Sequence, residues 1–387
     1  MKLNIYNVSL DSRSSKVLIC FGTILSHLVP LKNASGVFFF FPHWHVGGAE
    51  KVHADIVQCV KESKPWVFFT HQSVDCKFKE MFAKSGRLFN VWALLKYTLP
   101  FSIGLVSGYI NRHKNTVVFG CNSRFFYKMV PFVGSNARCI DLMHAFGGGS
   151  EDFSLPAVPS LFARVAINKK TVDDFKEQYH AHGIDSKYLD RIVVIENRVP
   201  VPECRPNKEY SGRLRLLYVG RGSEEKRVHL IGKAATLCRL KSINAEFIFI
   251  GDVTEAVAKE DRESCTFLGE ISDFAKIQQI YDASHILLLA SSREGFPMVI
   301  MEAMAHGVVP VSTEVGGIPV HLQDGINGVL IREISEELIV EEMVNAISSL
   351  ASDAAALEKL SQAAYVYAKK NFGSDNFCTS YRRLFFN

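Results

Sequence analysis

Short apolar runs alternate with helical patterns along most of the chain. Residues 37–41 (VFFFF) and 116–120 (TVVFG) in the first half, and 214–219 (LRLLYV) and 286–289 (ILLL) in the second, are almost entirely apolar. Strands of this kind are buried on both faces, as in parallel sheets covered by helices. Between such runs, stretches such as GGAEKVHADIVQCVKE repeat apolar residues at helical spacing. The alternation predicts an α/β protein.

The alternation starts twice, which predicts two domains. Residues 198–212, between the two sets of strands, hold three prolines and many polar residues, as is typical of a linker. The length of 387 residues also fits two domains of ordinary size better than one. We expect two Rossmann-like, doubly wound parallel-sheet domains that face a central cleft, over residues 37–205 and 206–387. The terminal helices of the second are candidates to cross back to the first.

Residues 1–36 form an N-terminal extension whose role the sequence leaves open. Their most apolar stretch, 17–31, is shorter than the roughly 18 residues of a membrane helix, and His27 and Pro30 interrupt it. It also lacks the basic start and the cleavage site of a signal peptide. We interpret it as a core-packing or interfacial segment. We expect a cytoplasmic protein, with peripheral attachment to the inner face of the cytoplasmic membrane as an option.

The nine cysteines contain no C-x-x-C pair. A zinc site and a disulfide framework are therefore both unexpected. Free thiols are typical of proteins in a reducing cytoplasm, which agrees with the expected location. We expect no bound metal.

Charge is unevenly distributed, although the whole chain carries only +4. Residues 1–205 contain 25 Lys and Arg against 16 Asp and Glu, whereas residues 206–387 contain 19 against 24. A basic N-terminal half indicates an anionic partner, such as a phosphorylated lipid, an anionic membrane surface or a polyanion other than nucleic acid. Chance variation among solvated lysines is the alternative interpretation.

Two glycines, Gly47 and Gly48, follow the first strand and open a helix. Glycines allow close approach to the backbone, and the free N–H groups of a helix start attract anions such as phosphate. An ordinary strand-to-helix turn gives the same pattern. The G-x-G-x-x-G of nicotinamide-binding proteins is absent at this turn.

Two cations follow the strand that ends at Gly220. Arg221 comes at once and Lys226 five residues later, at the strand end where open α/β sheets bind ligands. Arginine binds a diphosphate bidentately and lysine acts as a point charge. Solvated charges near a helix start are the alternative, but cations there oppose the helix dipole. We therefore expect both residues in a ligand site.

Two glutamates lie on either side of a helix start in the stretch SSREGFPMVIMEAMAHG. Glu294 precedes the expected helix, which starts near Pro297, and Glu302 lies within it. A carboxylate pair of this kind accepts hydrogen bonds from two sets of vicinal hydroxyls, on a ribose and on a sugar. One surface and one structural glutamate is the alternative. The apolar neighbours of Glu302 make it less easily explained as surface charge.

Five segments together resemble the retaining glycosyltransferases of family four, which have the two-domain GT-B fold. Glu294 and Glu302 match that family's Glu-seven-residues-Glu signature. The resemblance runs from about residue 37 to the C-terminus and is densest after residue 212. Its last segment is highly specific, whereas the first alone is not. The segments are GGAEKV (47–52), VGRGSEEK (219–226), FIFIGD (247–252), FLGEISD (267–273) and SSREGFPMVIMEAMAHGVVPVSTEVGGIPVHLQDGINGVLI (291–331).

The resemblance implies roles for the two cations and the two glutamates. Arg221 and Lys226 would bind the donor's diphosphate and stabilise the leaving group, which removes the need for a metal cofactor. Glu302 would hold the ribose hydroxyls and Glu294 would face the donor sugar.

The resemblance also implies roles for backbone groups. Those of Gly295, Phe296 and the neighbours of Pro297 would touch the sugar hydroxyls. Gly269 and Glu270 would border the base.

On the N-terminal side the resemblance is looser. Gly47 and Gly48 would meet the phosphate or the acceptor, and His144 resembles the family's active-site histidine. Other histidines near strand ends compete with it, namely His43, His45 and His71. The sequence also departs from the family: Ala145 replaces a frequent acid, Arg227 stands where glycine is common, and NRVP (197–200) replaces the usual NG before the linker.

The implied activity is that of a retaining hexosyltransferase in the synthesis of a cell-surface polysaccharide or glycoconjugate. We expect a UDP sugar as donor, with a GDP sugar as the alternative, and a glycan or lipid-linked glycan as acceptor. A GT-B-fold sugar-nucleotide epimerase and a non-catalytic glycan-binding subunit are the rival hypotheses.

Residues 87–101 predict an amphipathic helix, either packed on the first sheet or interfacial.

Overall fold

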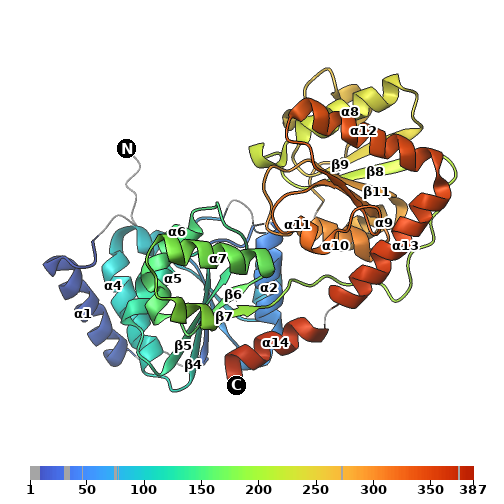
Figure 1. Ribbon diagram of the computed structural model, residues 1–387. Helices are drawn as coiled ribbons and strands as arrows, with labels where there is room; N and C mark the ends of the chain where they lie inside the picture. The colour runs from blue at the N-terminus through green and yellow to red at the C-terminus, as the bar shows by residue number, and fades with distance from the viewer. Residues whose placement is uncertain are drawn as a thin grey trace. The chain divides into compact units, whose positions relative to one another are not determined.

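The computed structural model describes residues 9–29, 35–45, 47–73, 76, 78–271, 273–373 and 375–387, and it divides into two compact units (Figure 1). The first unit comprises Met1–Glu196 together with Asp375–Asn387, and the second comprises Asn197–Ser374. The division falls just ahead of the proline-rich segment 198–212. The last helix of the chain belongs to the first unit.

The first unit is built on a seven-stranded parallel sheet with the order β3-β2-β1-β4-β5-β6-β7. Such an order arises because the chain starts in the middle, winds to one edge and then crosses to wind toward the other. The strands are β1 (Val37–Phe41), β2 (Trp66–Phe69), β3 (Arg87–Asn90), β4 (Thr116–Cys121), β5 (Ala137–Met143), β6 (Ala163–Ala166) and β7 (Ile192–Val194).

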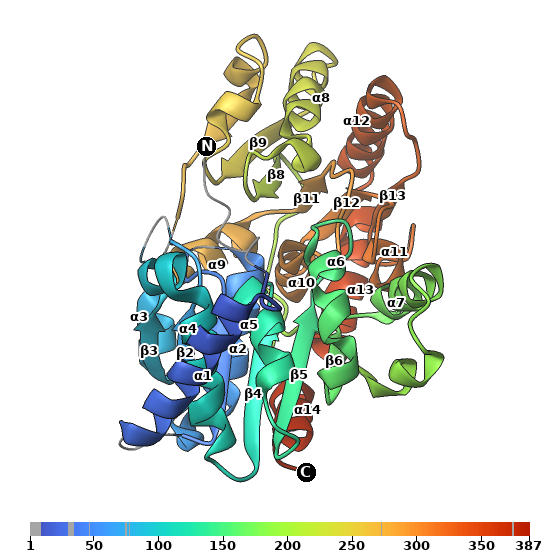
Figure 2. The ribbon, with the colours of Figure 1, turned by 90° about the vertical axis from the view of Figure 1, so that its left-hand side faces the viewer.

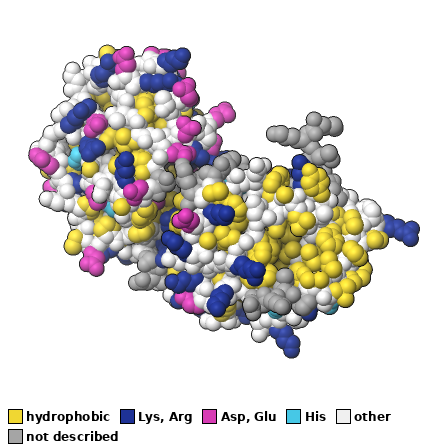
Figure 3. Space-filling model, turned by 180° about the vertical axis from the view of Figure 1, so that it is seen from behind, with side chains coloured by type: hydrophobic (Ala, Val, Ile, Leu, Met, Phe, Trp, Pro, Cys, Tyr) yellow, Lys and Arg dark blue, Asp and Glu magenta, His cyan; other side chains and the backbone are white. Residues whose placement is uncertain are grey.

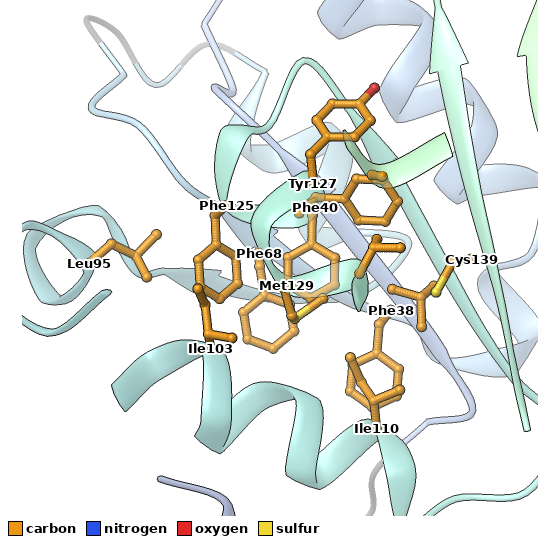
Figure 4. Packing of buried hydrophobic residues seen from close by; sticks show 14 of the residues in the cluster. Phe38, Phe40, Phe68, Leu95, Ile103, Ile110, Phe125, Tyr127, Met129 and Cys139 are labelled. Atoms are coloured by element: carbon orange, nitrogen blue, oxygen red, sulfur yellow. The ribbon is translucent and has the colours of Figure 1, made fainter. Parts of the chain in front are cut away.

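Helices cover both faces of this sheet, as Figure 2 shows. Phe38 and Phe40 of β1 belong to a core shared with α1, α4 and α5 (Figure 4). Phe39 points to the opposite face and contacts Phe385 of α14. The helices are α1 (Arg13–Leu28), α2 (Gly48–Cys59), α3 (Lys79–Ala83), α4 (Trp92–Asn111), α5 (Arg124–Met129), α6 (Ser150–Ser154), α7 (Lys169–Ala181) and α14 (Asp375–Phe386).

The second unit is built on a six-stranded parallel sheet with the order β10-β9-β8-β11-β12-β13. Its strands are β8 (Leu214–Val219), β9 (Ala245–Ile250), β10 (Cys265–Phe267), β11 (Ile286–Leu289), β12 (Val309–Thr313) and β13 (Val329–Ile331). Its helices are α8 (Val228–Leu240), α9 (Phe274–Ala283), α10 (Met298–Ala305), α11 (Ile318–His321), α12 (Glu336–Ser352) and α13 (Ala354–Asn371). The predicted α/β class, with two doubly wound parallel sheets, is confirmed.

The expectation of free cysteines is wrong for one pair. Cys59 of α2 and Cys378 of α14 form a disulfide within the first unit. The partners are 319 residues apart in the chain and meet only because α14 returns to pack beside α2. Spacing along the sequence carries no sign of this pairing.

The helix predicted over residues 87–101 is also corrected. Arg87–Asn90 is the edge strand β3, paired in parallel with β2. The helix α4 begins only at Trp92 and changes direction at Thr98, two residues before Pro100. A short apolar run satisfies helix and strand periodicity alike, and pairing with β2 decides between them here.

Candidate active site

The second sheet has a topological switch point between β8 and β11. These strands are neighbours, and the chain leaves them toward opposite edges of the sheet. Loops at the carboxyl ends of such strands diverge and leave a crevice, which is where open α/β sheets bind ligands. Lys226 follows β8 and Glu294 follows β11. Two residues predicted from sequence therefore come from the two strands on either side of the switch point.

Lys226 and Glu294 form an ion pair. The Nζ atom of Lys226 lies 2.6 Å from Oε1 of Glu294, and the hydroxyl of Ser291 donates to the same oxygen over 2.7 Å. The side chain of Glu294 is 8% exposed and that of Lys226 is 20% exposed. Partial burial removes water from the pair and strengthens each charge's effect on its surroundings. The pair therefore places a cation beside a carboxylate at the carboxyl ends of β8 and β11.

The end of β12 and the loop after it hydrogen-bond to the loop that carries Glu294. Gly317 N donates to the carbonyl of Gly295 over 2.6 Å, and the hydroxyl of Thr313 donates to the carbonyl of Ser291 over 2.6 Å. Gly316 has a φ of +58°, and a Cβ atom there would lie 1.7 Å from the carbonyl oxygen of Glu294. Only glycine fits this position.

Arg227 is a supporting residue that the sequence marked only as a departure from the family. Its φ is +46°, in the left-handed region where glycine carries no penalty. Its side chain donates to the carbonyls of Ala290 (Nε, 2.7 Å) and Ser291 (Nη2, 3.0 Å). Arg227 thus fixes the carboxyl end of β11, from which the Glu294 loop starts.

Arg221 lies at the carboxyl end of β8 with an exposed side chain. Its backbone is fixed, because the hydroxyl of Tyr218 donates to its carbonyl over 2.8 Å. Burial, and after it the charges of Glu294 and Glu225, raise the pKa of Tyr218, so this hydroxyl stays a donor. Both predicted cations, Arg221 and Lys226, follow β8.

Glu302 lies on α10, and its Oε2 accepts a hydrogen bond from the hydroxyl of Tyr281 over 3.0 Å. Burial, and after it Glu302, raise the pKa of Tyr281. The methionines of α10 are buried, and Gly307 ends the helix region with a φ of +65°. Pro297 is the N-cap of the helix, one residue before the position expected.

Phe296 directs its ring into the core, where it contacts His321 and Phe372 at centroid distances of 4.4 Å and 5.6 Å. Its side chain is 8% exposed. The ring therefore serves packing, and the expected use of backbone N–H groups in this turn stays a prediction.

Gly269 and Glu270 follow β10, two strands from β8 in the same sheet. Gly269 has a φ of +65° and accepts a hydrogen bond from Gly251 N over 2.9 Å. Glu270 is exposed. Because all strands are parallel, both residues lie at the same edge of the sheet as Lys226.

The sheet of the first unit also has a topological switch point, between the neighbouring strands β1 and β4. Gly47 and Gly48 lie there, as the N-cap and first residue of α2. A Cβ atom on Gly47 would lie 2.1 Å from Oε2 of Glu50, because this carboxylate folds back over the helix start, so a larger residue here would displace the Glu50 side chain. His45 Nε2 lies 3.6 Å from Oε1 of Glu50. A sugar hydroxyl suits this carboxylate better than a phosphate.

His144 directly follows β5, and its Nε2 lies 3.1 Å from Nε2 of His53 on α2. Burial lowers the pKa of His144 to about 4. Burial, and after it His144 and then His43, lower the pKa of His53 well below its usual value. Both rings are therefore neutral at pH 7, and one donates its proton to the other. Cys121 completes a group whose donor atoms lie within 4.8 Å of one another, a set that fits a transition metal.

The competing histidines form a separate cluster after β1 and β2. The rings of His43 and His45 stack at 4.5 Å, and those of His43 and His71 lie 5.5 Å apart. Burial, followed by the charges of His45 and His71, lowers the pKa of His43 to about 4. His144 is thus not part of this group.

Comparison with known proteins now adds to this geometry. The region 213–353 matches the family described as glycosyl transferases group 1. A crystal structure of HepE from Anabaena in complex with UDP and glucose superimposes with a TM-score of 0.68, over 90% of this chain and 98% of that one, at 17% identity. The chain has the GT-B fold. The lipopolysaccharide outer core galactosyltransferase WaaB superimposes with a TM-score of 0.65, over 90% of this chain and 98% of that one, at 18% identity.

The chain also resembles known proteins in amino-acid sequence. The lipopolysaccharide 1,2-N-acetylglucosaminetransferase of Salmonella typhimurium is 25% identical over 284 residues, which span 68% of this chain and 72% of that protein. An uncharacterized 41.2 kDa protein in the cps region of Klebsiella pneumoniae is 22% identical over 289 residues, spanning 70% and 78%. Together with the fold, these likenesses support a glycosyltransferase.

Several residues of the candidate site escaped prediction from sequence. Glu50, His53 and Tyr281 each contact a predicted residue or its backbone. Glu50 and His53 lie among the buried residues of α2, and Tyr281 is the buried residue of α9. Only Glu50 carries a local signal, since it stands at the third helical position, where a side chain reaches back to the helix start.

Proposed function

We propose that the protein is a retaining glycosyltransferase of the hexosyltransferase type, with a nucleotide diphosphate sugar as donor. The observation that carries this proposal is the meeting of Lys226 and Glu294 at the switch point of the second sheet. A diphosphate needs a cation, and the adjoining sugar needs an acceptor for its hydroxyls. The two groups stand side by side, as the two halves of such a donor do.

In this proposal the diphosphate lies against Arg221 and Lys226, which stabilise the leaving group as its charge develops. Glu294 accepts hydrogen bonds from the sugar and Glu302 from the ribose. The bond between the anomeric carbon and the phosphate oxygen breaks while the acceptor oxygen attacks from the same face. The acceptor's proton passes to the departing phosphate oxygen. Because two cations face the phosphate, the proposal includes no metal cofactor.

We propose a UDP sugar as donor and a glycan or lipid-linked glycan as acceptor. The UDP in the HepE complex supports the base. The lipopolysaccharide transferase of Salmonella and the cps-region protein of Klebsiella support a role in cell-surface polysaccharide or glycoconjugate synthesis. Gly47, Gly48 and His144 are assigned to the acceptor side, where Glu50 adds a carboxylate for a hydroxyl group.

The test is a binding screen of UDP and GDP sugars by calorimetry, followed by acceptor trials with the sugar that binds. The anomeric configuration of the product is read by NMR from the coupling at the anomeric proton. We expect an α-linked product from an α-linked donor. A product of inverted configuration contradicts the retaining mechanism.

A second arm separates transfer from the rival hypotheses. The protein is incubated with the bound nucleotide sugar and no acceptor, and the sugar is analysed for its epimer. Epimer release identifies an epimerase. Binding of glycans without any turnover, across the donor panel, identifies a glycan-binding subunit. Either result overturns the proposal.

A further inference from the structure

The helix pair of α1 and α4 carries large apolar side chains on its outer surface. Phe21 of α1 is 59% exposed, Leu28 is 72% exposed and Tyr97 of α4 is 79% exposed. The rings of Phe21 and Phe101 lie 6.0 Å apart, so the apolar surface continues from one helix to the other. Its members are Val17, Leu18, Phe21, Ile24 and Leu28 from α1, Val29 directly after it, and Leu94 and Tyr97 from α4. We call this set the α1–α4 face.

The α1 helix turns mainly small residues inward, together with Ile19, and its other large apolar residues outward. Its buried positions are Ser15, Ile19, Gly22 and Ser26. A Cβ atom on Gly22 would lie 2.2 Å from the carbonyl oxygen of Phe101, and one on Gly104 would lie 1.9 Å from that of Ile19. Such close backbone packing through small residues is typical of helices in lipid. A helix that serves only a protein core buries its large apolar residues instead.

Figure 3 shows the consequence on the surface, where hydrophobic side chains gather on the part of the first unit that α1 and α4 form. A contiguous apolar patch of this kind marks an interaction site. Because the face is apolar over its whole extent, its partner must present an apolar surface of similar size.

Cations outnumber acids around the face, where Asp11, just before α1, lies 4.0 Å from Lys16. The only charged side chains of α1 are Arg13 and Lys16, and the only one of α4 is Lys96. Residues 1–136, which contain both helices, hold 16 Lys and Arg against 6 Asp and Glu. Such a surface complements anionic headgroups next to acyl chains. A second copy of the chain would offer the same cations and no acid on these helices, so it lacks that complementarity.

We propose that the α1–α4 face docks on an anionic lipid bilayer, with α1 lying in the plane of the interface. α1 has 16 residues, which is about 24 Å of helix and too short for a hydrocarbon core of about 30 Å. α4 is the one described helix that is long and apolar enough to cross a membrane, but half of its most apolar stretch is buried within the protein. Interfacial docking therefore fits better than spanning. This partner goes beyond the transfer reaction and does not depend on it.

The first test is flotation of the full chain with vesicles, without donor or acceptor. Vesicles of phosphatidylcholine mixed with phosphatidylglycerol are compared with vesicles of phosphatidylcholine alone. We expect binding to the mixed vesicles that weakens with salt. The double variant Phe21→Gln/Ile24→Gln removes two exposed apolar groups and should lower the partition coefficient at least ~10-fold. The matched control Leu240→Gln/Ile334→Gln changes two exposed apolar residues of the second unit and should bind like the wild type.

A second test locates the contact with a dye. Cys20 on α1 and Cys204 in the second unit are both exposed free thiols. In single-site labelled proteins with Cys76→Ser, a polarity-sensitive fluorophore on Cys20 should shift to the blue with mixed vesicles, and one on Cys204 should not. Three results overturn the proposal. They are no binding by the wild type, equal binding by the Phe21→Gln/Ile24→Gln variant, and a dimer that this variant dissociates while vesicles stay unbound.

Discussion

The Nζ atom of Lys226 lies 2.6 Å from Oε1 of Glu294, although the two residues are 68 positions apart in the chain. They follow β8 and β11, the neighbouring strands that flank the switch point of the second sheet. The pair neutralises itself in the absence of a donor. In the proposed function, a nucleotide sugar would have to insert its phosphate and sugar hydroxyls between two groups that already attract each other.

Lys226→Met and Glu294→Gln should separate binding from transfer. We expect each to lower the rate of transfer at least ~100-fold, the scale of losing one group that stabilises transition-state charge. Calorimetry should show that Lys226→Met weakens UDP binding more than uridine binding, since the lysine meets the diphosphate. Glu294→Gln should leave UDP binding within about twofold, since the carboxylate meets the sugar.

Lys187→Met is the control for these variants, because it breaks an ion pair with Asp185 that is exposed on both sides. Transfer by this control should equal that of the wild type. A Glu294→Gln enzyme with normal turnover would sink the assignment of Glu294 to the donor sugar.

Arg227 should have two separable effects on stability, one from its hydrogen bonds to the start of the Glu294 loop and one from its left-handed backbone. Arg227→Ala removes the hydrogen bonds to the carbonyls of Ala290 and Ser291 and should lower the free energy of unfolding of the second unit by about 1–2 kcal/mol. Arg227→Gly loses the same bonds but relieves the backbone at φ +46°, which returns about 1 kcal/mol. Thermal unfolding of both variants measures the difference.

The exposed Arg221→Ala variant is the control for Arg227, since it also removes a guanidinium near β8. It should weaken donor binding without a change in thermal stability. If Arg227→Gly unfolds at a lower temperature than Arg227→Ala, the left-handed backbone at this position does not carry the cost assigned to it.

The sequence predicted most of the fold of the second unit, for a physical reason. Apart from Glu302, the residues taken from the resemblance in this unit follow a strand or precede a helix, and parallel strands bring their carboxyl ends to one edge. Lys226 and Glu294 could therefore be expected to approach each other from strand order alone. The pairing of Glu302 with Tyr281 could not, because it depends on how α9 packs beside α10.

The first unit was harder to predict, because contacts distant in sequence decide its details. His53 meets His144 across 91 residues, and Cys59 meets Cys378 across 319. The segment Arg87–Asn90 has a pattern that fits a helix, and it became a strand because β2 offers an edge. The face of α1 that meets α4 is made of small residues, which hydrophobic periodicity does not register.

His321 should make the second unit less stable in acid. Burial lowers its pKa to about 4 from 6.5, within a cluster that includes Phe296 and Phe372. Below pH 6.5 the unfolded chain binds a proton here, and the folded protein does not until about pH 4. Stability is therefore lost as pH falls between these values, by up to ~3 kcal/mol at this one group.

The variant His321→Leu does not titrate, so its unfolding temperature should fall less than that of the wild type between pH 7 and pH 5, roughly the range in which histidines charge. His180→Gln changes an exposed histidine of α7 and should follow the wild type. An equal fall in all three proteins shows that His321 is not responsible.

Transfer should persist after treatment with EDTA, because Arg221 and Lys226 supply the charge that a divalent metal would otherwise supply to the diphosphate. Within the described part of the chain, one group offers a place to test this, His53, Cys121 and His144, whose donor atoms lie within 4.8 Å of one another. The hydrogen bond between the two histidines, 3.1 Å long, explains their approach without a metal. We therefore assign His53 the role of holding the ring of His144.

His53→Gln should then lower kcat by about 10-fold through the orientation of His144, with KM for the donor unchanged. Elemental analysis of the purified wild type and of this variant should give the same metal content. Cys139→Ser, at a buried cysteine outside the group, controls for the loss of a buried polar side chain. Stoichiometric zinc in the wild type that disappears in His53→Gln, together with activity restored by added zinc, would replace the positioning role by a metal site.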